Sequence, residues 1–319
     1  MEKRIPDIVY HYCDTSAFYS IIQSSSLRMT NISKSNDYDE ISYCFEAFHE
    51  ALKESCRDFV NEYKENGLDL YFKDIRYDKL VSKAVRNNSL IYYVVCFSSE
   101  YDLLSQWREY ADNGKGVSIG FDTSQMIAAN DYTHLKFNSI CYDIMSDKQN
   151  LYYSIKDKLV EIKKKRGERT VFSEYENAIN EFLSGMVYNA VFYKNPAFKE
   201  EKEWRLVFYP FGSIRNLIVP NMICETSTNK LFYDRMIECF EYEREYTGLN
   251  RKKIQFKCAN DMLVSYTDIN FNKIKRTFIK EIVIGPKSRV DDKDLRLFLL
   301  ANGYDLSRIN IRKSSASYR

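Results

Sequence analysis

Residues 90–121 read LIYYVVCFSSEYDLLSQWREYADNGKGVSIGF, and this stretch decides the fold. Leu90 to Phe97 is a continuous run of mostly β-branched and aromatic residues, which is typical of a buried strand. Leu103 to Ala111 predicts a short helix, residues 112–114 (Asp-Asn-Gly) predict a turn, and Gly116 to Phe121 predicts a second strand. A buried strand, a helix and another strand therefore follow one another closely.

Strands and helices are mixed on both sides of this stretch, without the strict alternation of a doubly wound parallel sheet. The mixture favours an α+β protein, and we expect one elaborated domain over residues 1–319. The hydrophobic patterns predict further strands at Ile8–Tyr12, Leu27–Ile32, Leu135–Tyr142, Trp204–Phe208, Ile254–Phe256, Met262–Tyr266 and Ile279–Gly285. They predict further helices after a cap at Asp14–Ser16, from Asn36–Glu40 through Val60, and at Lys156–Lys165, Glu174–Tyr193, Tyr233–Tyr246 and Asp291–Asn302.

Charge and cysteine usage narrow the class of protein. The 47 Lys and Arg residues and 45 Asp and Glu residues give a net charge of +2, far from the basic balance of a dedicated nucleic-acid coat protein. Eight cysteines without a Cys-x-x-Cys pair indicate reduced, mostly buried thiols in a cytosolic protein. The N-terminus lacks the apolar stretch of a signal peptide, and no segment approaches the roughly 20 apolar residues that span a bilayer. We therefore expect a cytoplasmic protein without a membrane partner.

Several common catalytic motifs are missing from the sequence. Three histidines and no His-Glu-x-x-His motif leave little material for zinc, so we expect no metal site. Gly114, Gly116 and Gly120 do not form a dinucleotide-binding turn, because the last glycine is one place late and a strand follows Gly116 instead of a helix. No Gly-Lys-Ser/Thr loop and no Gly-x-Ser-x-Gly elbow occurs. These absences exclude P-loop enzymes and serine esterases.

Polar groups meet predicted strand ends in three patches: Tyr10–Tyr12, Cys96–Ser99 followed by Ser105–Tyr110, and Glu200–Arg205. Their motifs are YHY, SQWxxYADxGxGVxIGF and ExEWR, and a late IVIGP follows. This order resembles the bacterial domain of unknown function 2971 family, and the motifs extend over almost the whole chain. The family name by itself implies no activity.

The same order is more distantly similar to the ADP-ribosyltransferase superfamily. That superfamily places a His or Arg on its first strand, a hydroxyl or aromatic residue on a middle strand and a catalytic Glu on a later strand, often as Glu-x-Glu. The resemblance implies a split mixed β-sheet core with flanking helices and helical insertions, a transferase core in residues 1–210, and a C-terminal extension, 211–319, that completes the fold. It implies NAD as co-substrate. By position it implies catalytic roles for Glu203, His11 and Tyr110, and NAD contacts from His11, Tyr12, Ser98, Glu201 and Tyr110.

A carboxylate suits this chemistry, because breaking the nicotinamide–ribose bond produces a ribosyl cation like that of glycoside hydrolysis. We expect Glu203 to stabilise that cation and Glu201, on the same strand face, to orient the substrate. His11 would hold a ribose hydroxyl or the carboxamide. The remaining predicted contacts are stacking on nicotinamide by Tyr110 or Tyr12 and a ribose hydrogen bond from Ser98.

The acceptor would be a macromolecule, either protein or nucleic acid. By analogy, the enzyme would be a bacterial toxin or anti-phage effector with an antitoxin or defence-system partner protein. Two alternatives remain open: an NAD glycohydrolase with water as acceptor, and a non-catalytic nucleotide-sensing module. The same residues also have structural interpretations, with His11 as a satisfied strand histidine, Glu201 and Glu203 as a solvated charged face, and Trp107 and Trp204 as core anchors. Convergence of His11 and Glu203 on one pocket would favour the enzyme.

Overall fold

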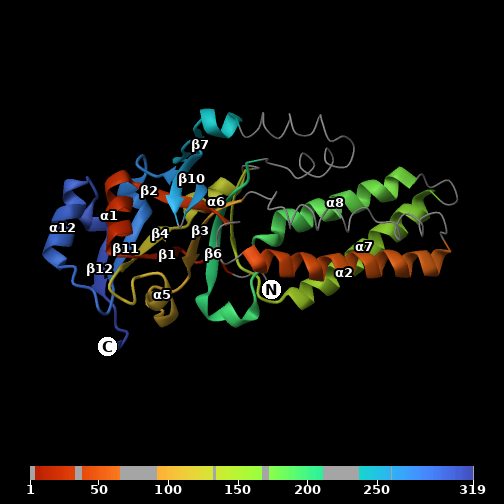
Figure 1. Cartoon of the computed structure of the whole chain (residues 1–319), viewed down its shortest axis with the longest axis horizontal. Helices are drawn as coiled ribbons and strands as arrows, with labels where there is room; N and C mark the ends of the chain where they lie inside the picture. The colour runs from red at the N-terminus through yellow and green to blue at the C-terminus, as the bar shows by residue number, and fades with distance from the viewer. Residues whose placement is uncertain are drawn as a thin grey trace.

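The computed structural model describes residues 4–32, 38–64, 92–131, 134–166, 172–210, 237–259 and 261–318. Within these ranges the chain is a mixed α+β protein built on one large mixed β-sheet with several helices (Figure 1). The strands are β1 (Ile8–Cys13), β2 (Ser26–Asn31), β3 (Tyr93–Ser98), β4 (Val117–Asp122), β5 (Leu135–Ser139), β6 (Glu203–Phe208), β7 (Arg244–Tyr246), β8 (Leu249–Arg251), β9 (Gln255–Ala259), β10 (Met262–Asn270), β11 (Ile279–Ile284) and β12 (Asn310–Lys313). The α+β class predicted from the sequence is therefore confirmed.

The sheet divides at β3. Its strand order is β12-β11-β4-β1-β3-β2-β10-β8-β7, with β6 and then β5 on the other side of β3, and β9 beside β10. β1 meets β3 only at the pair Tyr10–Ser98, whereas β2 meets the opposite end of β3 through Thr30 and Asn31. From there β1 continues along β4 and β2 along β10. One edge of β3 thus pairs with two strands, β1 and β2, that belong to separate halves of the sheet.

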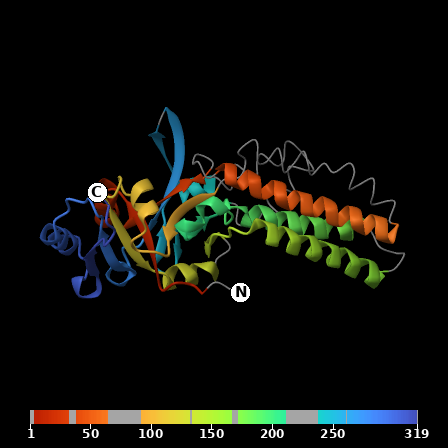
Figure 2. The same ribbon diagram turned by 90° about the horizontal axis from the view of Figure 1, so that it is seen from below.

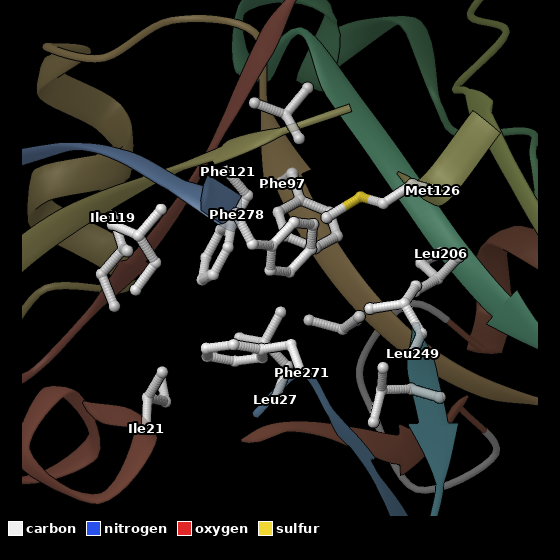
Figure 3. Packing of buried hydrophobic residues seen from close by; sticks show 14 of the residues in the cluster. Ile21, Leu27, Phe97, Ile119, Phe121, Met126, Leu206, Leu249, Phe271 and Phe278 are labelled. Carbon is white, nitrogen blue, oxygen red and sulfur yellow. The ribbon is translucent and has the colours of Figure 1, made fainter. Parts of the chain in front are cut away.

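The largest hydrophobic cluster lies between these two halves (Figure 3). Phe121 of β4 packs edge-on against Phe97 of β3, with ring centroids 6.0 Å apart, and against Phe271, 5.7 Å away. Leu27 of β2 and other side chains of the second half close the cluster from the other side. Burial of apolar surface contributes roughly 25 cal/mol of stabilising free energy per Å², so this cluster helps to hold the two halves together.

The long helices form an arm that extends away from the sheet (Figures 1 and 2). They are α2 (Tyr38–Tyr63), α7 (Ile144–Arg166) and α8 (Phe172–Ala190). A second hydrophobic cluster joins them to the face of β3 and β6 opposite the first cluster, and it contains Phe45, Phe48, Leu52, Phe59 and Val60 of α2. These five side chains recur at helical spacing within the helix predicted through Val60, and all are buried.

Shorter helices connect and cover the strands. They are α1 (Thr15–Ser24), α5 (Leu104–Glu109), α6 (Ser124–Ala128), α11 (Lys275–Phe278) and α12 (Asp292–Ala301), with 3-10 turns η2 (Ala129–Asp131), η4 (Pro196–Glu201) and η5 (Leu306–Arg308). α1 begins because the Asp14 side chain accepts a hydrogen bond from the Ala17 amide, and α12 begins in the same way at Asp291. Throughout the described ranges, each helix is too short or too polar to cross a lipid bilayer.

The C-terminal third completes the sheet but differs from one prediction. A helix was expected over Tyr233–Tyr246, of which residues 233–236 lie outside the described ranges. The rest is helical only over 237–241 and then forms β7, which pairs with β8 through a tight turn at Thr247 and Gly248, both with positive φ. The helix prediction is wrong over 244–246 because the turn chemistry of Thr-Gly favours a hairpin there.

Candidate functional site

One face of the sheet carries polar side chains at the same level of neighbouring strands. Tyr10 of β1 pairs with Ser98 of β3, and Ser98 pairs with Glu203 of β6. In the other direction Tyr10 pairs with Gly120 of β4, which pairs with Glu281 of β11. Directly paired residues project to the same face, so Tyr10, Ser98, Glu203 and Glu281 form one line, here called the polar row.

Glu203 belongs to a buried ion cluster, defined as Lys194, Glu201, Glu203 and Arg205. The Arg205 Nε donates to Glu203 Oε1 at 2.6 Å, and the Lys194 Nζ donates to Glu203 Oε2 at 3.2 Å and to Glu201 Oε2 at 2.7 Å. All four residues are at most 8% exposed. Burial works to raise the pKa of Glu203, but the charges of Arg205 and Lys194 outweigh it and hold that pKa below its usual value. Glu203 is therefore ionised at neutral pH.

The prediction that Glu201 and Glu203 lie on the same face of one strand is wrong. Glu201 ends the turn η4, and Lys202 adopts a left-handed conformation with φ of 47°, so β6 begins only at Glu203. The two carboxylates meet through Lys194 instead. Sequence reasoning missed Lys194, and the one local signal was the following Asn195-Pro196, which starts η4 and disfavours helix before the proline.

His11 lies on the opposite face from the polar row. Its neighbours Val9 and Cys13 are in the core cluster between the sheet halves, and its ring packs edge-on against Phe97 with centroids 5.9 Å apart. The neutral ring donates from Nδ1 to the Cys96 carbonyl oxygen at 2.9 Å. Burial lowers the pKa of His11, against a smaller opposing effect of that hydrogen bond. His11 and Glu203 thus do not line one pocket.

Tyr12 and Ser98 share the face of the polar row and are engaged in holding the chain after β3. The Tyr12 hydroxyl donates to the Glu100 carbonyl at 2.8 Å and accepts from the Leu103 amide at 2.9 Å. The Ser98 hydroxyl donates to the Glu201 carbonyl at 2.7 Å. Tyr110 follows α5 and is 44% exposed. Of the predicted site residues, Tyr12, Ser98, Glu201 and Glu203 therefore lie on one side of the sheet and Tyr110 lies at the surface.

A second buried charge that the motifs did not reveal lies at the other end of the polar row. Glu281 accepts hydrogen bonds from the Tyr10 hydroxyl at 2.7 Å, from Asn310 Nδ2 at 2.6 Å and from Arg312 Nη2 at 2.7 Å. The Arg312 guanidinium lies 3.6 Å above the Tyr101 ring. Burial and Glu281 raise the pKa of Tyr10. A Cβ at position 120 would lie 2.9 Å from the Tyr10 Cε1 atom. Gly120 therefore leaves the space that the Tyr10 ring occupies.

The glycines of the two glycine-containing motifs meet in space. The Gly285 amide donates to the Gly116 carbonyl at 3.0 Å, and the Lys287 amide donates to the Gly114 carbonyl at 2.8 Å. A Cβ on Gly116 would lie 2.0 Å from the Cys13 carbonyl oxygen, and a Cβ on Gly285 would lie 2.5 Å from the Gly114 carbonyl oxygen. Only glycine allows this backbone-to-backbone packing, which fixes the loop before β4 against the loop after β11.

Beside this glycine junction lies a groove between α1 and α12, of about 950 Å³. Its lining residues are Thr15, Phe18, Tyr19, Asp112, Lys115, Lys287, Arg289, Val290, Asp291, Asp294, Leu295 and Phe298. Aromatic, cationic and anionic groups are all present, and the groove is called the α1–α12 groove below. Within the described part of the chain, no group of three or more His, Cys, Asp and Glu side chains is arranged to hold a metal ion.

Comparison with protein families finds a match over part of the chain. The model of a family described as "Protein of unknown function (DUF2971)" matches residues 106–206, which run from α5 to β6 and include Asp112, Lys115 and the buried ion cluster. The match supports the resemblance to that family over this segment. Searches of curated proteins and of solved structures each found no significant match.

Proposed function

We propose that the chain is an ADP-ribosyltransferase-like enzyme that uses NAD to modify a macromolecule, either protein or nucleic acid. The observation that carries the proposal is the register of Tyr10, Ser98 and Glu203 on three neighbouring strands. The superfamily uses a first-strand residue, a middle-strand hydroxyl or aromatic residue and a later glutamate. In this proposal Tyr10 takes the first-strand position on the reacting face, and His11 instead positions the β1–β3 junction through its bond to Cys96.

The division of the sheet at β3 supports the same proposal. The resemblance implies a split mixed sheet, and here β1 and β2 leave the same edge of β3 in different halves. The polar row crosses the sheet at the end of β3 where β1 is attached. A carboxylate at such a junction is held by strands on both sides, which suits the precise positioning that electrostatic catalysis requires.

The ion cluster supplies the charge that the chemistry needs. Departure of nicotinamide leaves a cationic ribose, and an ionised Glu203 stabilises it. The Lys194 ammonium lies 3.2 Å from Glu203 Oε2, in the place that a cationic sugar would take, and 2.7 Å from Glu201 Oε2. Lys194 would therefore remain with Glu201 and move away from Glu203 when NAD binds, so that Glu201 contributes by holding the displaced lysine.

Two other functions stay open, and a structural observation favours the first of them. A non-catalytic nucleotide-binding module is favoured by the placement of His11 and Glu203 on opposite faces and by the 5% exposure of Glu203. An NAD glycohydrolase would use the same carboxylate with water as acceptor. A role as a toxin or anti-phage effector, with a neutralising or defence partner, rests on analogy with the superfamily.

The test is incubation of the purified chain with labelled NAD and separate pools of protein, DNA and RNA. Glu203→Gln removes the charge and keeps the shape, and Glu281→Gln is the control for stability, because Glu281 is about as buried on the same face but contacts Tyr10 instead of the ion cluster. We expect label transfer by the wild type but not by Glu203→Gln. Full transfer by Glu203→Gln contradicts the proposal. Nicotinamide release without transfer identifies a glycohydrolase, and no turnover in any pool supports the non-catalytic module.

A further inference from the structure

We propose that the α1–α12 groove binds a nucleoside diphosphate, at a site separate from the polar row. The inference goes beyond the proposed transfer reaction, because no residue of the ion cluster lines this groove. It begins from the positions of three cations. Lys115 projects from the loop before β4, and Lys287 and Arg289 project from the loop after β11.

The glycine junction fixes the backbone positions of two of these cations, Lys115 and Lys287. Lys115 lies between Gly114 and Gly116, and Lys287 is two residues after Gly285, so the tight packing of those glycines sets the spacing of both lysine backbones. Lys115 has only a weak ion pair with Asp112, at 3.4 Å and well exposed. Neither Lys287 nor Arg289 forms an ion pair with a carboxylate within the described ranges, and the Lys287 ammonium lies over the Tyr318 ring, 3.9 Å from its centre. Three cations with such weak neutralisation favour a ligand that carries phosphate.

The aromatic part of the groove favours a base. Tyr19 of α1 stacks on Phe298 of α12, with ring centroids 5.2 Å apart and planes 10° from parallel. Tyr19 is nevertheless 51% exposed, so the face of its ring that Phe298 does not cover is open to a ligand. Stacking of a base on an aromatic ring favours binding whatever the base, because every base has a π-face. The stacked pair also holds Tyr19 in one orientation before any ligand binds.

The carboxylates of the groove select among phosphate-bearing ligands. Asp112, Asp291 and Asp294 equal the three cations in number, so the groove as a whole is neutral. A bare anion or the repeated phosphates of a nucleic acid chain would be repelled by the carboxylates. A nucleotide satisfies both signs, because its phosphates bind the cations and its ribose hydroxyls donate to carboxylates, as in dinucleotide sites. The volume of about 950 Å³ is within the usual range for small-molecule sites.

The test is calorimetric titration of the full chain with ADP, adenosine and inorganic pyrophosphate. We expect ADP to bind more tightly than either fragment. Lys287→Gln and Arg289→Gln should each weaken ADP binding by about 10-fold or more, since a hydrogen bond to a charged group is worth about 1.5–3 kcal/mol. Tyr19→Leu should weaken ADP and adenosine but leave pyrophosphate unchanged. Lys293→Gln, an exposed α12 lysine outside the groove, is the matched control and should change nothing.

Three outcomes would overturn the inference: no ADP binding by the folded wild type, equal ADP affinity in the Lys287→Gln, Arg289→Gln double variant, or equal binding of ADP and pyrophosphate. The last would mean an adventitious anion site only. Glu203→Gln separates this inference from the proposed transfer reaction. It should bind ADP like the wild type even though it transfers no label, so either proposal can fail while the other stands.

Discussion

Replacing Lys194 with methionine tests whether the buried ion cluster stabilises the fold as its geometry indicates. The variant keeps most of the side-chain length and apolar stem but removes the ammonium that lies 2.7 Å from Glu201 and 3.2 Å from Glu203. Breaking a buried ion pair by removing one partner costs about 3–5 kcal/mol, because an uncompensated charge stays behind. Arg205 still neutralises part of Glu203, so we expect a loss near the lower figure, about 3 kcal/mol.

The assay is urea-induced unfolding followed by circular dichroism, with Lys293→Met as the control on an exposed lysine. A double-mutant cycle with Glu201→Gln separates the pair energy from side effects. The double variant should lose about 1–3 kcal/mol less than the sum of the two single changes, because the neutral amide that replaces the Glu201 carboxylate leaves no stranded charge. A loss below about 1 kcal/mol for Lys194→Met, or strict additivity in the cycle, would refute the reasoning.

The pH dependence of the same variant gives an independent check. The pKa of Glu203 is lowered from 4.5 in the folded chain, so its stabilising contribution is present above pH 4.5 and is lost as the pH falls through the lower folded value. Without the Lys194 charge that pKa lies closer to the unfolded value. The acid-induced loss of stability that comes from Glu203 still begins below pH 4.5, but it should be smaller and complete at a higher pH in Lys194→Met than in the wild type.

Three further changes have definite expected outcomes. Gly116→Ala places a Cβ 2.0 Å from the Cys13 carbonyl oxygen, and only a backbone shift can relieve that clash. We therefore expect the free energy of unfolding in urea to fall by about 3 kcal/mol or more. A variant as stable as the wild type would show that the loops are not packed this way. Burial lowers the pKa of His11 from 6.5, so the free energy of unfolding of the wild type should fall as the pH drops below 6.5. In His11→Gln this dependence on pH should be weaker. An unchanged dependence on pH would count against a buried neutral ring. Cys258 is exposed, so it should account for the fast reaction of the chain with a thiol reagent. The measurement is made in a Cys224→Ser background, because Cys224 lies outside the described residues. Fast labelling that survives the further change Cys258→Ser would contradict the assignment.

Local sequence pattern was sufficient for many of the elements. β3 follows from a continuous apolar run, β4 follows directly after the predicted Asp-Asn-Gly turn, and the apolar side of α2 follows from its helical spacing. Trp107 and Trp204 were expected to be core anchors, and they are 0% and 6% exposed. These features depend on neighbours within one or two turns or strand periods, which is the range over which a single sequence carries information.

The candidate site depends on distant contacts that no local pattern specifies. The face on which His11 lies is set by the register of β1 with β4 along its length and with β3 at Tyr10–Ser98, strands that are far apart in the sequence, and a shift of one residue would reverse it. Glu201 left the strand because Lys202 takes a left-handed conformation. Lys194 reaches both carboxylates through a turn that the Glu-x-Glu motif does not include.

Glu203 is both a member of the buried ion cluster and the proposed catalytic carboxylate, so loss of activity on its removal has two explanations. Glu203→Gln leaves the charges of Arg205 and Lys194 partly unbalanced, just as Glu281→Gln does for Arg312. If both variants lose similar stability and only Glu203→Gln loses transfer, misfolding cannot explain the difference, because Glu281→Gln is destabilised to the same extent. If both lose transfer in proportion to their stability, Glu203 is a structural anchor, and the reacting carboxylate must be sought elsewhere.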